Sequence, residues 1–206
     1  TCGGVDLKVT FTAPLFMEDL KLLSRPVNYL TYSVAARDGR EHEVEVYFEA
    51  SPRWALDQPY QQSASKGYEA DGLLYLKSGS KEQNILAKQG DDLRIDWGYF
   101  YMVAGKENTA YSVGNSTELR KNFVNGTLNS ASLEREDSNG NMALVRSHGK
   151  VKNVTDKIML GYDDIYSIQY FGTNLRPYWN SKGDRTIEAE MLAAYNEYDK
   201  LLARCY

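Results

Sequence analysis

Alternation of apolar and polar residues with a period of two recurs along the chain and restricts most of it to β-structure. In residues 41–50, Val44, Val46 and Phe48 alternate with glutamates, and this segment follows the hairpin dipeptide Asp38–Gly39. Because successive side chains of a strand point to opposite faces, the pattern predicts a strand with one buried and one solvated face. Such strands, joined by short turns and not alternating with helices, are typical of antiparallel sheets.

The same periodicity predicts about ten strands and sets the fold class. The strands are expected at residues 5–12, 27–37, 41–50, 73–77, 93–103, 109–113, 132–136, 142–147, 158–162 and 165–171. Residues 51–71 are rich in glutamine and small polar residues and are expected to form a long loop, whereas 115–123 form a short helix. The sequence therefore predicts a mainly β protein, an antiparallel β-sandwich with a C-terminal amphipathic α-helix.

Residues 90–103 are the most informative single segment. From residue 93 apolar and polar residues alternate, which would place Arg94 and Asp96 on one face of a strand and Trp97 on the other. After Gly98, every position from 99 to 103 is apolar or aromatic, as in a strand that is covered on both faces. The segment predicts a central strand, whose Arg94 and Asp96 face is either a ligand-facing patch or a buried ion pair at a domain contact.

The last segment of the chain has helical periodicity. Asp184 is a suitable N-cap, Lys200 and Arg204 stand late in the segment, and apolar residues recur at helical spacing as far as Cys205. An amphipathic helix at the end of a β chain has to pack on something, and a following helical domain would fit. We therefore divide the chain into a β-sandwich domain at residues 1–180 and a connector helix at 181–206.

Charge and composition exclude some classes of partner. The chain has 24 basic and 28 acidic residues, a net charge of −4, and no basic stripe, so nucleic acid is not expected as a partner. No run of about 18 apolar residues is present, so no membrane span is expected. Cys2 and Cys205 could pair if the termini meet, although two free thiols are the preferred interpretation. The chain begins at Thr1 without a signal peptide, which we interpret as a piece of a longer protein.

Catalytic templates are mostly missing from the sequence. It contains no glycine-rich phosphate loop, no G-x-S-x-G elbow and no H-E-x-x-H, and its histidines are His42 and His148. The pair Asp163–Asp164 stands between two apolar segments, where adjacent carboxylates could bind Ca²⁺ or a ligand or, more commonly, form a turn. Trp54 lies in the expected loop and either contacts a ligand or anchors the loop. The sequence indicates no cofactor.

Several motifs occur together in a recognisable order. They are VTFTAPL at 9–15, LSRPV at 23–27, the hairpin at 38–48, GSKEQ at 79–83, DDLRIDWGY at 91–99 and LGYDDIYSIQYFG at 160–172. Together they resemble the N-terminal region of the glutaminase A family, secreted enzymes of bacteria and filamentous fungi. The resemblance implies a β-sandwich in front of a helical α/α toroid, in a secreted or periplasmic protein that hydrolyses L-glutamine to L-glutamate and ammonia.

The resemblance assigns no catalytic residues to this stretch, and the fragment alone is expected to be inactive. The candidates for substrate binding in a cleft shared with the toroid are Arg94, Asp96, Trp97, Tyr99, Asp163 and Asp164. A charged pair beside aromatic rings could hold the carboxylate and ammonium groups of glutamine. The alternative is a carbohydrate-binding or purely structural accessory domain of a secreted sugar-processing enzyme, with Trp54, Trp97 and Trp179 as stacking platforms.

Overall fold

The computed structural model describes residues 2–91, 93–128 and 134–206. Asp92 and the first two residues of the strand expected at 132–136 lie outside the described residues. The strands are β1 Val5–Thr12, β2 Val27–Ala36, β3 His42–Ala50, β4 Ser63–Ala70, β5 Leu73–Ser80, β6 Tyr99–Gly105, β7 Thr109–Gly114, β8 Glu134–Arg135, β9 Asn141–Val151, β10 Asn153–Asp163, β11 Ile168–Tyr170 and β12 Thr173–Leu175. The helices are α1 Leu20–Ser24, α2 Ser116–Val124 and α3 Ile187–Cys205, with 3-10 turns η1 Pro52–Ala55 and η2 Tyr178–Asn180.

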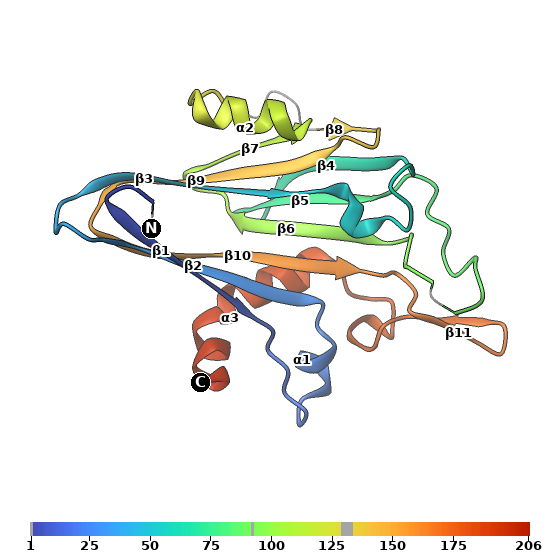
Figure 1. Cartoon of the computed structure of the whole chain (residues 1–206). Helices are drawn as coiled ribbons and strands as arrows, with labels where there is room; N and C mark the ends of the chain where they lie inside the picture. The colour runs from blue at the N-terminus through green and yellow to red at the C-terminus, as the bar shows by residue number, and fades with distance from the viewer. Residues whose placement is uncertain (1, 92, 129–133) are drawn as a thin grey trace.

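The strands form two antiparallel sheets that stack face to face (Figure 1). The larger sheet has seven strands in the order β1-β2-β10-β6-β5-β4-β8, and the smaller has three in the order β3-β9-β7. The short strands β11 and β12 form a separate hairpin that projects from the body of the domain. The predicted fold class, an antiparallel β-sandwich with a C-terminal amphipathic helix, is confirmed.

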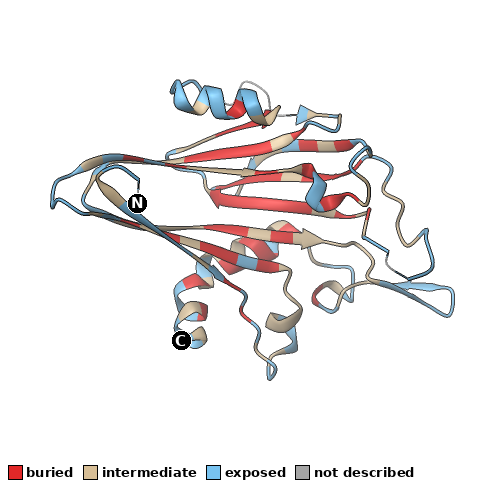
Figure 2. Ribbon diagram, in the orientation of Figure 1, coloured by how far each residue is buried: buried red, intermediate tan, exposed pale blue. Residues whose placement is uncertain are grey.

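Strand β6 is covered on both faces, as its unbroken apolar sequence predicts. It lies between β10 and β5 in the seven-stranded sheet. Phe100 and Met102 point into the core between the two sheets, whereas Tyr101 and Val103 point into a second core on the other face. Figure 2 shows that buried residues concentrate along these inner strands. The seven-stranded sheet therefore lies between two hydrophobic cores and contributes side chains to both.

Helix α3 closes the second core by lying against the outer face of the seven-stranded sheet (Figure 1). Its buried stripe includes Met191 and Ala194, and the carbonyl oxygen of Ala194 accepts a hydrogen bond from the buried hydroxyl of Tyr29 (2.8 Å). The buried Arg25, directly after α1, pairs with Glu190 of the helix (3.0 Å). The helix begins at Ile187 with Thr186 as N-cap, so the expected N-cap, Asp184, was wrong by two residues.

The prediction of a long loop at residues 51–71 was wrong, because this segment contains the strand β4. The buried positions of this strand include small polar residues, Ser63 and Ser65. The hydroxyl group of Ser65 forms a hydrogen bond with the hydroxyl group of Ser78 on β5 (2.7 Å). Hydrophobic periodicity cannot detect a strand whose buried positions are serines.

Two further expectations are settled by the described residues. The single strand expected at 165–171 is instead the hairpin of β11 and β12, which turns at Phe171 and Gly172. Cys2 and Cys205 are both free thiols. Across the described ranges, none of the helices is long and apolar enough to cross a membrane.

Candidate functional site

The segment in front of β6 is not a strand, which separates two of the candidate residues. Residues 93–98 have no ladder partner, and β6 begins only at Tyr99. Arg94 is exposed, whereas Asp96 is 1% exposed, so the two side chains do not share a face as the alternation predicted. The alternation resembled a strand, but residues 93–98 pair with no other strand among the residues that the structure describes.

Asp96 is held by neighbouring loops. Its carboxylate accepts hydrogen bonds from Gln61 (3.1 Å) and Lys88 (3.1 Å). Lys88 also pairs with Asp57 (3.0 Å), and this contact holds the pKa of the Asp57 carboxyl below its usual range. A buried carboxylate with such partners is stabilised and oriented inward. Asp96 therefore joins the loop after η1 to the loop before β6.

Trp97, Tyr99, Asp163 and Asp164 are brought together at the end of β10. The Trp97 indole nitrogen donates to the carbonyl oxygens of Asp164 (2.8 Å) and Tyr166 (3.0 Å). Tyr99 is the cross-strand neighbour of Asp163. The four residues therefore lie together at one corner of the seven-stranded sheet.

The aspartate pair forms a turn, the commoner of its two expected roles. Asp163 Oδ1 accepts from the backbone N–H of Ile165 (3.0 Å), and Asp164 Oδ2 accepts from the Ser167 hydroxyl (2.6 Å). Burial raises the pKa of Asp163 above its ordinary value. In the part of the chain that the structure describes, His, Cys, Asp and Glu side chains form no group of three or more suited to a metal ion.

Two lysines beside this corner were not predicted from the sequence. Lys77 of β5 lies directly opposite Lys66 of β4 and, on its other side, opposite Tyr101 of β6. Its ammonium group lies 3.6 Å from the centre of the Tyr99 ring and 5.6 Å from that of Tyr101. We call Lys66, Lys77, Tyr68, Tyr99 and Tyr101 the Lys77 patch. It occupies the face of the sheet that also carries α3.

Acidic groups border the Lys77 patch. Glu188 of α3 accepts a hydrogen bond from the Tyr68 hydroxyl (2.6 Å), and Asp163 lies beside Tyr99. Burial lowers the pKa of Lys77, the neighbouring Lys66 lowers it further, and Glu188 and Asp163 act in the opposite direction. Perturbed titrating groups gathered on one face are a physical indicator of a functional site.

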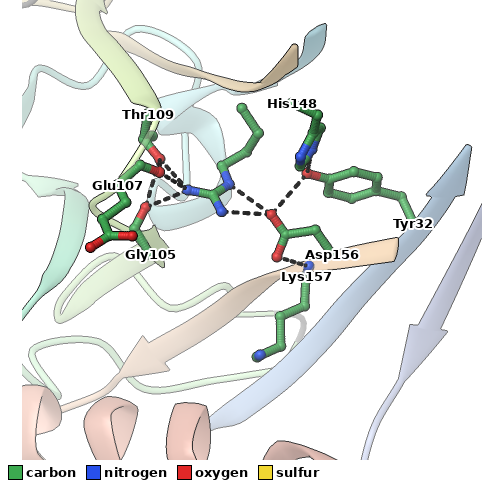
Figure 3. Close-up of polar contacts among 8 residues, drawn as sticks. Tyr32, Gly105, Glu107, Thr109, His148, Asp156 and Lys157 are labelled. Atoms are coloured by element: carbon green, nitrogen blue, oxygen red, sulfur yellow. Dashed lines mark hydrogen bonds and ion pairs between the residues drawn. The ribbon is translucent and has the colours of Figure 1, made fainter. Parts of the chain in front are cut away.

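A second polar cluster links the two sheets (Figure 3). Arg146 of β9 donates from Nε (2.8 Å) and Nη2 (2.7 Å) to one carboxylate oxygen of Asp156 on β10. The same oxygen accepts from the Tyr32 hydroxyl (3.2 Å), which also bonds His148 (2.7 Å). Burial lowers the pKa of His148 and raises that of Tyr32. Because Tyr32 is fully buried and its hydroxyl already has partners, we interpret this cluster as a structural link.

The three tryptophans do not form one platform. Trp179 is buried in the core beneath α3, and the indole N–H of Trp97 is occupied by two carbonyl groups. Trp54 of η1 is 62% exposed and borders a groove of about 460 Å³. The described residues that line this groove are all uncharged: Phe11, Thr12, Ala13, Asn28, Tyr29, Trp54, Phe100, Leu160, Gly161 and Tyr162.

A family model described as a domain of unknown function (DUF5127) matches residues 1–206. Glutaminase A of Aspergillus oryzae is 28% identical over 176 residues, which are 82% of this chain and 25% of that protein. A solved structure named "Putative kojibiose phosphorylase from human microbiome" is similar with a TM-score of 0.38 and 9% identity, over 95% of this chain and 19% of that chain. The chain thus spans about a quarter of the curated relative that it matches.

Proposed function

We propose that this chain, which belongs to the family described as a domain of unknown function (DUF5127), is the β-sandwich domain of a larger, glutaminase-A-like amidohydrolase. The parent protein would hydrolyse L-glutamine to L-glutamate and ammonia. The observation that carries the proposal is the match to glutaminase A, which spans most of this chain and a quarter of that protein.

The domain supports catalysis in this proposal and does not perform it alone. The titrating cluster around Arg146 is saturated by its own partners, and Asp96 is oriented into the structure. Of the earlier candidates, Tyr99 belongs to the Lys77 patch and Asp163 borders it, so these two become the proposed cleft residues. The hydrogen bond from the Trp97 indole to the Asp164 carbonyl oxygen helps to position these two residues. Arg94 remains a candidate contact on the exposed loop.

The helical domain implied by the resemblance would adjoin the face that carries α3. The helix is packed on the outer face of the seven-stranded sheet, beside the Lys77 patch. The first turn of α3 borders the patch through Glu188, whereas the last turn lies beside Phe16 and Glu18, so a following domain would reach the patch by folding back over this face. Secretion or export to the periplasm belongs to the same proposal and rests on the resemblance alone.

The parent protein should release ammonia from L-glutamine, whereas residues 1–206 expressed alone should not. The reason is that residues 1–206 match only about a quarter of glutaminase A, so the helical domain that the resemblance implies is not part of the protein tested. A coupled ammonia assay on both proteins, with L-asparagine as comparison substrate, makes the measurement. Ammonia release by residues 1–206, or its absence from a folded parent protein, would contradict the proposal.

A second candidate function, carbohydrate binding, is favoured by one observation. The exposed ring of Trp54 borders an uncharged groove, and aromatic rings beside polar groups such as the Asn28 amide suit the apolar faces and hydroxyl groups of sugars. A glycan array with residues 1–206 should then give binding that Trp54→Ala abolishes and Trp97→Phe leaves intact. A flat array would remove this alternative.

A further inference from the structure

We propose that Lys66 and Lys77 form a binding site for the carboxylate group of an amino acid, with Asp163 and Glu188 placed to receive its ammonium group. The site lies on the outer face of the seven-stranded sheet, beside the first turn of α3. This inference deepens the proposed function and rests on it for the identity of the amino acid, glutamine. Its four residues belong to β4, β5, β10 and α3.

The register of the sheet makes two basic residues direct cross-strand neighbours. Lys66 and Lys77 are cross-strand partners in the antiparallel pair β4 and β5. Like charges in this arrangement repel each other and destabilise the pair. On the far side of Lys66 the register places Glu134 of β8, but among the described residues neither lysine has a carboxylate within ion-pair distance. An anion bound beside these two lysines would reduce the repulsion.

Aromatic rings hold the ammonium groups without neutralising them. Lys77 lies 3.6 Å from the centre of the Tyr99 ring, and Lys66 lies 5.5 Å from that of Tyr68. Such contacts attract a cation and leave its positive charge in place. Because Lys77 is half-buried, its charge is screened less than on an open surface, and its attraction for an anion is stronger.

The acidic groups at the border determine which anion fits. Glu188 carries one negative charge at the start of α3, and Asp163 carries another at the end of β10. Both influence the titration of Lys77, so they lie within electrostatic range of it. They would repel a dianion, whereas a zwitterion can place its carboxylate at the lysines and its ammonium group towards the acids. The combination is therefore complementary to an α-amino acid with an uncharged side chain.

The test is a titration of residues 1–206 with L-glutamine, followed through the NMR signals of the lysine CεH₂ groups. The Lys77 signal should shift and saturate with a dissociation constant of about 1 mM or weaker. Lys77→Met should weaken binding at least tenfold, while Lys81→Met, which removes an exposed lysine paired with Glu136, should leave it unchanged. Acetate should shift the same signal more weakly, and propylamine should not.

Several outcomes would overturn the proposal. A Lys77 signal that does not respond, or a shift of equal size at Lys81, would show that no specific carboxylate site exists. The wild-type titration does not depend on the variant folding, and Tyr99→Leu offers a second variant that should also weaken binding. Thermal melting of each variant shows that it is folded.

Experiments on the parent protein distinguish two possible occupants of the site. One is a free amino acid, and the other is an acidic side chain from the part of the parent protein outside residues 1–206. If the site takes substrate, Lys77→Met should raise KM for L-glutamine several-fold and change kcat little. Lower thermal stability of the parent variant with an unchanged KM would overturn the amino-acid assignment and give the site to an acidic side chain. Amino-acid binding by residues 1–206 without glutaminase activity of the parent would refute the proposed function and leave this inference intact.

Discussion

Replacing Arg146 by methionine should destabilise the domain by about 3 kcal/mol or more, because it leaves the carboxylate of Asp156 without its cation. The two side chains are 12% and 16% exposed, so water can only partly replace the guanidinium group. The substitution also removes the hydrogen bonds from Arg146 to the carbonyl oxygens of Gly105 (2.7 Å) and Glu107 (2.6 Å). For a chain of this length the melting temperature should fall by roughly 6–12 °C.

Lys106→Met is the matched control for this prediction. Lys106 lies between Gly105 and Glu107, whose carbonyl oxygens bind Arg146, and it pairs with Glu69 at 2.6 Å. Because the two side chains are 56% and 37% exposed, the substitution should cost at most about 1 kcal/mol. The double variant Arg146→Met with Asp156→Leu should regain much of the lost stability, since it removes the unpaired charge. Urea denaturation measures all three free energies of unfolding. Equal losses for Arg146→Met and Lys106→Met would show that the inter-sheet cluster of Figure 3 is not a structural link.

Gly98→Ala should be the most damaging single substitution at the candidate site. Gly98 has a φ of +77°, and a Cβ atom there would lie 2.2 Å from the carbonyl oxygen of Asp163. The variant combines a disfavoured backbone conformation with a clash against rigid backbone, at a cost of roughly 2–5 kcal/mol. It should also separate Trp97 from Asp164, and the indole N–H signal of Trp97 in NMR spectra would report this change.

Gly72→Ala separates the two contributions to that cost. Gly72 has the same φ of +77°, but no atom lies within 4 Å of the position that its Cβ would take. This control should therefore lose only about 1–2 kcal/mol and leave the Trp97 signal in place. If Gly98→Ala cost no more than Gly72→Ala, the turn at Asp163 and Asp164 would not be packed against the start of β6.

The β-sandwich and its terminal helix were predictable because both depend on hydrophobic periodicity. Strand β3 alternates cleanly and α3 has an apolar stripe, and both patterns follow directly from which side chains are buried. Residues 93–98 show the limit of this reasoning. Their alternation satisfies the strand pattern, but a strand also needs a neighbouring backbone, and residues 93–98 are held by side-chain hydrogen bonds to Asp96 and Gly98.

The candidate site was only partly predictable, because half of it depends on which strands are neighbours. Asp163 and Tyr99 belong to segments that the sequence marks as unusual, and they do lie together. Lys66 and Lys77 could not be connected, since β4 presents buried serines and was mistaken for a loop. Glu188 reaches the same face from α3, through a contact between residues 120 positions apart in the sequence.

Strand β6 contributes side chains to both hydrophobic cores, and this also determines how the domain unfolds. Met102 contributes to the core between the sheets, and Tyr101 and Val103 contribute to the core under α3. If α3 detached, the tyrosine and valine side chains would enter water, and the strand that supports the other core would lose half of its packing. Neither layer can melt while the other stays intact, so folding is cooperative across the whole domain. The backbone amides of β6 should therefore exchange with solvent only when the entire molecule unfolds.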